Sequence, residues 1–194
     1  MKQDQISSYN IANGICVEVG TWQGGFTESL LSKSNVSKVF CVDPYKHFIN
    51  DEYPDGMNDL TQEQFDDLFD KVKNKLTNKY GDKVEFIREL STEGSKKFED
   101  NSLDFVYIDG NHDSKYVLED LKAWYPKVKL GGFLCGDDVY SRNLSEHDSD
   151  GNVKITWSPG CWGKYGTYKA LVDFGKKFEL NETQFSILKD EETI

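Results

Sequence analysis

Two segments of the sequence place acidic side chains and a histidine directly after short apolar runs. In DFVYIDGNHD the acid Asp109 stands three residues before His112, and GGFLCGDD ends in the pair Asp137 and Asp138. Carboxylates that converge at neighbouring strand ends repel one another unless a cation compensates their charge. Oxygen ligands without cysteine suit Mg²⁺ or Mn²⁺. The three aspartates therefore predict a divalent metal site.

Beside a metal at this place, His112 could act as a general base. A cation that chelates two substrate oxygens lowers the pKa of a hydroxyl and orients it. A neutral imidazole nearby can accept the proton at a pH close to 7. A purely structural role is the alternative, because Asp-Gly favours a turn and Asn111 or Asp113 suits a helix cap. In that case His112 would bond a nearby backbone carbonyl.

Alternating strands and helices must position these side chains. Five runs rich in valine, isoleucine and phenylalanine are bounded by glycine, proline or aspartate, which is typical of strands buried on both faces of a parallel sheet. Thr61 and Gln64 predict a capping box for a helix that ends at Tyr80, and a second helix starts near Ser114 and stops before Pro126. The alternation predicts a doubly wound α/β sheet. The five runs are residues 14–20, 38–44, 83–90, 103–110 and 131–138.

The C-terminal part departs from this alternation. After a helix near 166–177, KFELNETQFSILKDE offers two strands joined by a short turn, which predicts an antiparallel hairpin at the sheet edge. Ligands of such sheets bind at the carboxyl ends of the strands, where Asp43 joins the acids named above. The longest stretches without periodicity, 44–60 and 139–164, leave from the same ends. We expect them to form walls of a substrate site.

A glycine-rich loop, VEVGTWQGG, follows the first strand. Glycine there lets the backbone approach a ligand closely. A dinucleotide fingerprint needs glycine at the first, third and sixth positions of a six-residue window; Gly20 and Gly25 fit, but Trp22 occupies the third. This disfavours an NAD(P)-dependent oxidoreductase. A non-catalytic nucleotide- or metabolite-binding Rossmann-like module stays open as an alternative.

The pattern ExGxxxGG, followed by the acid in VDPY, resembles motifs of class I S-adenosylmethionine-dependent methyltransferases. The resemblance implies that the loop packs against the methionine part of the cofactor and that Asp43 accepts hydrogen bonds from the ribose hydroxyls. It also implies adenine contacts from RELS after the third strand, although Ser91 is equally suited to cap a helix. The cofactor-binding residues so implied are Glu18, Gly20, Thr21, Trp22, Gly25, Asp43, Glu89, Ser91 and Asp109.

The segment FVYIDGNHDSKYVLEDLKAWYPKVKLGGFLCGDD is similar to a methyltransferase group that includes metal-dependent sugar O-methyltransferases of macrolide biosynthesis. The resemblance implies a mostly parallel seven-stranded sheet of the Rossmann-like methyltransferase fold, with the C-terminal hairpin antiparallel. It implies that Asp109, Asp137 and Asp138 bind Mg²⁺ or Mn²⁺ and that His112 is the general base. This chain has Asp-Asp where the group typically has Glu-Asp. The implied reaction is methyl transfer to a hydroxyl of a small polyhydroxylated acceptor, with a sugar as first choice.

Length and composition limit the domain number and the classes of partner. The chain has 194 residues, of which 37% are hydrophobic, so we expect one domain over residues 1–194. No apolar run approaches the ~20 residues of a membrane span, and the N-terminus is polar, so we expect a cytoplasmic protein without a membrane partner. A net charge of -11 opposes nucleic acid as a partner. The oligomeric state stays open, a homo-oligomer included.

Three of the four cysteines, Cys16, Cys41 and Cys135, lie within apolar runs. Free cysteine in such a setting behaves as a small hydrophobic residue, so we expect these three to be reduced core residues. The segment 138–166 is polar and aromatic, which would suit the face of a sugar ring, but the tryptophans there could equally close the core. The identity of the acceptor does not follow from the sequence.

Overall fold

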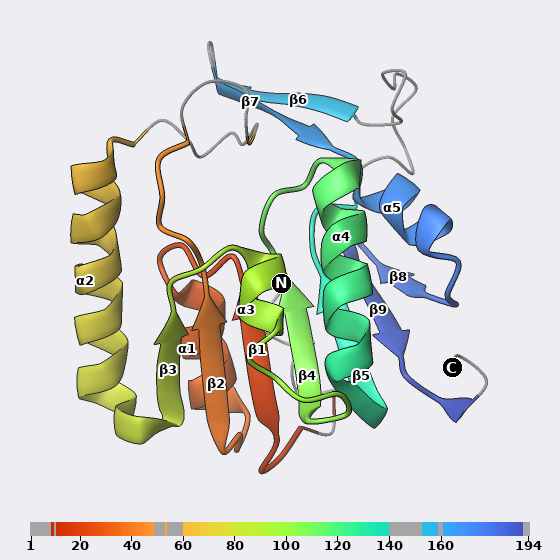
Figure 1. The fold of residues 1–194 in the computed structure, drawn as a ribbon, viewed down its shortest axis with the longest axis horizontal. Helices are drawn as coiled ribbons and strands as arrows, with labels where there is room; N and C mark the ends of the chain where they lie inside the picture. The colour runs from red at the N-terminus through yellow and green to blue at the C-terminus, as the bar shows by residue number, and fades with distance from the viewer. Residues whose placement is uncertain are drawn as a thin grey trace.

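The structure is a computed structural model of the chain that describes residues 9, 11–48, 53, 60–139, 153–158 and 161–191. For 153–158 and 161–165 it describes the backbone only. Strands and helices alternate along most of the chain (Figure 1). In chain order the elements are β1 (Ile15–Val19), α1 (Gly25–Lys33), β2 (Lys38–Val42), α2 (Gln62–Tyr80), the 3-10 turn η3 (Gly81–Lys83), β3 (Val84–Ile87), α3 (Ser91–Ser95), β4 (Leu103–Ile108), α4 (Ser114–Trp124), the 3-10 turn η4 (Tyr125–Lys127), β5 (Val128–Gly136), β6 (Val153–Ser158), β7 (Cys161–Tyr165), α5 (Thr167–Phe174), β8 (Glu179–Asn181) and β9 (Gln184–Leu188).

The central sheet has seven strands in the order β3-β2-β1-β4-β5-β9-β8. Strands β1 to β5 are parallel, whereas β9 runs antiparallel to both β5 and β8. The register aligns the carboxyl ends: Val19 lies opposite Val42 and Ile108, and Ile108 lies opposite Gly136. The predicted fold, including the antiparallel C-terminal hairpin, is confirmed. The loops that follow β1, β2, β4 and β5 therefore leave from one edge of the sheet.

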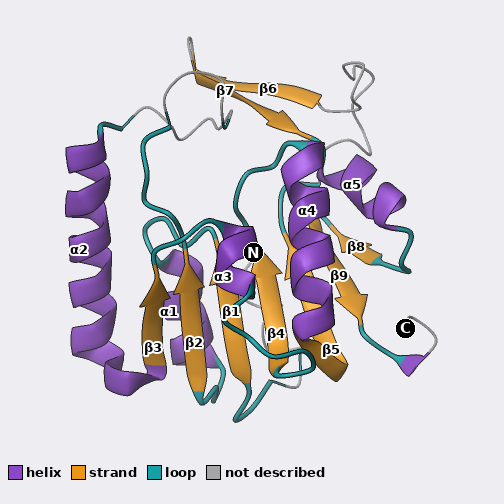
Figure 2. Ribbon diagram, viewed as in Figure 1, coloured by secondary structure: helices purple, strands orange, loops and turns teal. Residues whose placement is uncertain are grey.

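Helices cover both faces of this sheet (Figure 2). Helices α3 and α4 lie in front of it and α1 lies behind it, as the two figures show. The front core includes Val106, Leu121 and Trp124, which are at most 1% exposed. Behind the sheet, Cys16 and Leu30 pack with buried neighbours. The predicted core positions of Cys16, Cys41 and Cys135 are confirmed, and all three are free thiols.

Helices α2 and α4 begin as the sequence indicates. Thr61 Oγ1 accepts a hydrogen bond from the Gln64 amide, and the Thr61 amide donates one to the Gln64 side-chain oxygen, so the capping box is confirmed. Asp113 caps α4, where its side chain accepts a hydrogen bond from the Lys115 amide at 3.1 Å. Helix α4 gives way at Tyr125 to the 3-10 turn that contains Pro126. The starts of α2 and α4 therefore mark where the loops that precede them at the carboxyl edge of the sheet end.

A second, two-stranded antiparallel sheet, β6–β7, is the main difference from our expectation of a non-periodic stretch over 139–164. In Figure 1 it lies above the carboxyl ends of the central strands. The sequence does carry a pattern typical of a β-hairpin, because VKITWS alternates apolar and polar residues and a Pro-Gly pair follows it. The rest of that stretch, 139 excepted, lies outside the described residues, as do 49–52 and 54–59 of the stretch 44–60. None of the described helices is long and apolar enough to span a membrane.

Candidate cofactor and metal site

The glycine loop after β1 rests directly on the loop after β4. Gly20 has a φ of 83°, and a Cβ built on it would lie 2.0 Å from the Asp109 carbonyl oxygen and 2.7 Å from the Gly110 nitrogen. Any side chain at this position would collide with backbone that cannot rotate away. Gly20 is therefore required by a close approach inside the protein. This contact joins the predicted cofactor loop to the segment that carries Asp109 and His112.

Asp43 ties the loop after β2 to the same glycine loop. Its two carboxylate oxygens accept backbone hydrogen bonds from Trp22 and from Tyr45, each at 2.8 Å. The Tyr45 hydroxyl in turn donates to the Trp22 carbonyl at 2.6 Å. Trp22 has a φ of 47°, a conformation that a non-glycine residue rarely adopts, and these bonds hold it there. A carboxylate oxygen can accept more than one hydrogen bond, so the contacts are compatible with the predicted ribose contact.

Glu18 lies beneath the glycine loop and is only 2% exposed. Its carboxylate accepts hydrogen bonds from the Thr27 amide at 3.2 Å and from the Thr27 hydroxyl. Burial raises the pKa of Glu18 well above its usual value, although the Thr27 hydroxyl opposes this. The side chain is thus directed at α1, and a contribution of Glu18 to cofactor binding would act through the loop that it supports.

Two features of the loop fit a bound cofactor. Thr21 is 2% exposed, and among the described residues its hydroxyl has only the thiol of Cys41, a weak hydrogen-bond partner, close to it. A buried hydroxyl without a strong partner is costly, and a ligand would supply one. A Cβ built on Gly25 would meet no atom within 4 Å. Space therefore remains beside the start of α1, where we expected the methionine part of the cofactor.

The two residues predicted to contact adenine, Glu89 and Ser91, have different surroundings in the loop after β3. Glu89 is partly exposed and pairs with Lys97 at 2.9 Å. Ser91 is the first residue of α3 but not its N-cap, which is Leu90, so the alternative capping role is wrong. The Ser91 hydroxyl instead accepts a hydrogen bond from the Trp124 indole at 2.8 Å. It also hydrogen-bonds Asp120, which is 4% exposed; burial raises the pKa of Asp120 to about 7, and the Ser91 bond acts against this rise.

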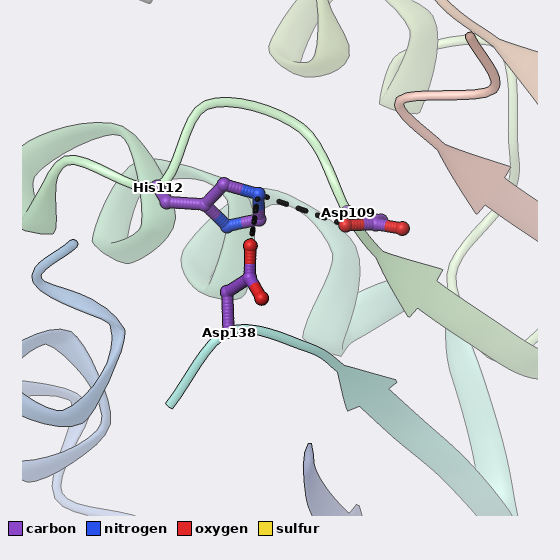
Figure 3. Close-up of side chains that lie close together, drawn as sticks. All are labelled: Asp109, His112 and Asp138. Carbon is purple, nitrogen blue, oxygen red and sulfur yellow. Dashed lines mark ion pairs between the residues drawn. The ribbon is translucent and has the colours of Figure 1, made fainter. Parts of the chain in front are cut away.

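Asp109, His112 and Asp138 converge at the ends of β4 and β5 (Figure 3). The His112 Nε2 atom lies 3.2 Å from a carboxylate oxygen of Asp138 and 3.6 Å from one of Asp109. One ligand atom of each residue lies within 4.8 Å of the other two. The side chains are 18–37% exposed, so the cluster is reachable from outside. Burial raises the pKa of Asp109 to about 6, and the other aspartates add to this while His112 opposes it.

The residues around His112 keep its loop in place. The His112 carbonyl accepts a hydrogen bond from the Gly166 amide at 2.7 Å, which links the loop to the start of α5. The buried Asn111 accepts a hydrogen bond from the Asp113 amide at 3.0 Å. The structural reading of Asn111 and Asp113 as turn and cap residues is confirmed. The imidazole of His112 is directed at two carboxylates.

Asp137, which the sequence predicts as a third metal ligand, lies outside this cluster. One of its oxygens accepts hydrogen bonds from the Asp138 amide and the Thr183 hydroxyl, both at 2.8 Å. The other lies 3.3 Å from the Tyr107 hydroxyl and 3.4 Å from the Gln184 amide nitrogen. Burial opposes ionisation of Asp137, but its pKa is lowered overall, and the bonds from Asp138 and Thr183 contribute to this lowering. Asp138 has a φ of 60°, and this turn separates the two neighbouring carboxylates.

Sequence reasoning missed Tyr107, Thr183 and Gln184 altogether. Tyr107 belongs to the apolar run of β4, Thr183 lies in the turn of the C-terminal hairpin, and Gln184 is the first residue of β9. The register, which sets β9 beside β5, brings them together with Asp137. Only Tyr107 could have been suspected from the sequence, because a tyrosine in a buried strand usually needs a hydrogen-bond partner for its hydroxyl.

Comparisons with known proteins identify the family and the fold. A protein of Acanthamoeba polyphaga mimivirus, uncharacterized protein R132, is 26% identical over 160 residues, which are 80% of this chain. This chain spans 65% of the length of that curated relative. An rRNA methylase from Streptococcus thermophilus is similar in structure, with a TM-score of 0.58 and 13% identity over 98% of this chain and 95% of that one.

A Streptococcus mutans protein solved in complex with SAH has a TM-score of 0.56 and 15% identity over 95% of this chain and 92% of that one. At such identities these likenesses show the fold. The family model described as a methyltransferase domain matches residues 17–139, which is more than half of the chain. By this match and by its fold, the chain belongs to the methyltransferase-domain family, within the class I S-adenosylmethionine-dependent methyltransferases.

Proposed function

We propose that this protein transfers the methyl group of S-adenosylmethionine to a hydroxyl of a small polyhydroxylated acceptor, with a divalent cation and His112 as general base. One observation carries the proposal. Asp109 and His112 stand on a loop whose backbone touches the cofactor loop at Gly20, and Asp138 joins them from the end of β5. Cofactor and acceptor chemistry would thus meet at one edge of the sheet, as expected of doubly wound folds.

The cofactor would be held by the loops after β1, β2 and β3. The glycine loop, with the buried Thr21 hydroxyl and the space beside Gly25, would take its methionine part. Asp43 would accept hydrogen bonds from the ribose hydroxyls, and Glu89 and Ser91 lie where adenine contacts are expected. Glu18 would act from beneath by holding the start of α1 through Thr27.

The donor set of the cluster fits a divalent cation. Two carboxylates, Asp109 and Asp138, offer hard oxygen ligands of the kind that Mg²⁺ and Mn²⁺ prefer. Their charges would be compensated by the ion, which favours the ionised form of Asp109 despite its burial. Bound S-adenosylmethionine supplies an electrophilic methyl group, and a bound cation supplies positive charge that lowers the pKa of a coordinated hydroxyl.

His112 would move the proton. Its Nε2 atom would accept the proton of the acceptor hydroxyl while the hydroxyl oxygen forms a bond to the methyl carbon. The carbon–sulfur bond breaks at the same time, and its electron pair stays on sulfur in S-adenosylhomocysteine. Asp138, 3.2 Å from Nε2, would stabilise the imidazolium that results. The Gly166 bond to the His112 carbonyl would keep the ring in place from the backbone side.

A sugar is the acceptor class that we propose, and support for it comes from the sequence. The segment from β4 to β5 resembles sugar O-methyltransferases, and 138–166 is rich in polar and aromatic residues. The likeness to an rRNA methylase concerns the fold. A net charge of -11 opposes binding of a polyanion such as RNA, since no cationic excess would neutralise phosphates.

The test is an assay of S-adenosylhomocysteine release over a panel of sugars, catechols and carboxylates, with Mg²⁺, with Mn²⁺ and with EDTA. We expect turnover with a sugar that EDTA abolishes, and that Asp138→Asn also abolishes. Asp113→Asn is the matched control, because it removes a neighbouring acid and asparagine caps a helix equally well. Undiminished turnover in EDTA would refute the metal. Cofactor binding without methyl transfer to any acceptor would favour a binding module.

A further inference from the structure

Asp138 reaches His112 from a backbone conformation that needs support. Its φ of 60° lies in the left-handed region, which residues other than glycine adopt rarely. The amide of Asp138 donates to the Asp137 carboxylate at 2.8 Å. An aspartate that accepts a hydrogen bond from a nearby amide stabilises such turns. The direction of the Asp138 side chain therefore depends on where the Asp137 carboxylate is held.

Side chains from the C-terminal hairpin hold that carboxylate. The Thr183 hydroxyl donates to the same Asp137 oxygen that accepts the Asp138 amide, at 2.8 Å. The Gln184 amide group donates to the Tyr107 hydroxyl at 2.8 Å and lies 3.4 Å from the second Asp137 oxygen. Tyr107 and Gln184 are 1% and 6% exposed. The Gln184–Tyr107 bond is therefore shielded from competition with water, and the bonds to Asp137 are partly so.

The backbone of the hairpin is fastened to the same place. The Val139 amide donates to the Thr183 carbonyl at 2.7 Å, directly after the Asp137–Asp138 pair. One residue before the pair, Gly136 lies opposite Phe185 of β9, and a Cβ built on Gly136 would be 2.5 Å from the Phe185 ring. The end of β5 is thus clamped on both sides of the acid pair by the start of β9, which Figure 1 shows beside it.

We infer that Asp137 is a positioning residue, and that Thr183 and Gln184 act through it to hold the Asp138 carboxylate against His112. The inference rests on the proposed function for its catalytic meaning. It makes the β8–β9 hairpin part of the active-site support, and it replaces the ligand role that the acid pair suggested for Asp137. Partners that orient a metal ligand typically change metal affinity by about 10- to 100-fold when they are removed.

The first test measures binding of Mn²⁺ alone, by electron paramagnetic resonance of the free ion during titration. Thr183→Val removes the hydroxyl donor but keeps the shape, and it should weaken Mn²⁺ binding about tenfold. Thr183→Ser restores the donor and should bind within about twofold of wild type. Thr77→Val, on the exposed face of α2, is the matched control and should change nothing. Affinity for S-adenosylmethionine should be the same in all four proteins.

The second test needs no metal. The chain has three histidines, so the ring resonances of His112 can be assigned by substitution in labelled protein. In metal-free protein Thr183→Val should shift these resonances, whereas Thr183→Ser should leave them in place. Wild-type affinity for Mn²⁺ together with unchanged His112 resonances in Thr183→Val would overturn the inference. If wild type binds no Mn²⁺, the proposed metal dependence fails, and the resonances alone decide whether Asp138 is positioned in this way.

Asp137→Asn separates positioning from ligation and serves as the second variant if Thr183→Val does not fold. It keeps the shape of the side chain, and we expect about a tenfold loss of Mn²⁺ affinity, smaller than the loss in Asp138→Asn. If Asp137→Asn and Asp138→Asn lose Mn²⁺ affinity equally, while both Thr183 variants keep wild-type Mn²⁺ affinity, Asp137 is a ligand and the inference is overturned. Thermal unfolding of each variant confirms that the folded proteins are being compared.

Discussion

Two glycines of the cofactor loop should respond in opposite ways to the same substitution. Gly20→Ala places a methyl group 2.0 Å from the Asp109 carbonyl oxygen, at a φ of 83°. The left-handed conformation costs alanine about 1 kcal/mol, and overlap with rigid backbone adds about 1–3 kcal/mol. We therefore expect the free energy of unfolding to fall by about 3 kcal/mol. Because the two loops must separate, binding of S-adenosylmethionine and of Mn²⁺ should weaken together.

Gly25→Ala places its methyl group where no protein atom lies within 4 Å. Gly25 opens α1, and alanine is a better helix former, so the free energy of unfolding should stay the same or rise by up to about 1 kcal/mol. If the cofactor occupies that space, its dissociation constant should rise about tenfold or more, which corresponds to about 1.4 kcal/mol. Mn²⁺ affinity should not change.

Urea unfolding and calorimetric titration of the two variants check these expectations side by side. A stable Gly20→Ala protein with wild-type affinities would refute the close contact between the two loops. A Gly25→Ala protein that binds S-adenosylmethionine as tightly as wild type would refute the placement of the cofactor beside the start of α1. Neither result could be produced by loss of the fold, because each variant would be measured while folded.

Three further predictions concern single side chains. The folded protein keeps Asp120 protonated up to a pKa of about 7, while the unfolded chain ionises it at its usual lower value. Wild-type stability should therefore fall by roughly 3 kcal/mol from pH 5 to pH 8 through this group. Asp120→Asn should lose that dependence in urea unfolding, and an equal slope in both proteins would contradict the burial argument. His112→Gln should lower kcat about 100-fold or more with little change in the affinity for S-adenosylmethionine. Nitrogen hyperfine coupling from His112 to bound Mn²⁺ should be absent if the ring is the base, and its presence would make His112 a ligand.

Much of the fold followed from local pattern. The strands β1 to β5 are short apolar runs with clear boundaries, and such runs fill the centre of a parallel sheet whatever their partners are. Helices α2 and α4 begin at capping residues that act within one turn. The pair β6–β7 is hard to predict because VKITWS is a short alternating run inside a long polar stretch.

The site was harder to predict because it depends on which way neighbouring residues point. Asp137 and Asp138 are adjacent acids in the sequence, and only the φ of 60° at Asp138 separates a carboxylate that faces His112 from one that faces Thr183. Gly20 looked like a place for a ligand, yet the backbone of Asp109 requires it. These distinctions arise from contacts between loops distant in the sequence, which local propensity does not encode.

Calorimetric titration of the purified protein with S-adenosylmethionine tests the central claim most directly. The account predicts saturable binding with one site per chain, and weaker binding when Asp43 is replaced by alanine. NADH, which the loop with Trp22 should not accept, serves as the comparison ligand. Absence of binding heat with S-adenosylmethionine, or tight binding of NADH in its place, would contradict the assignment of this loop as a methyl-donor site.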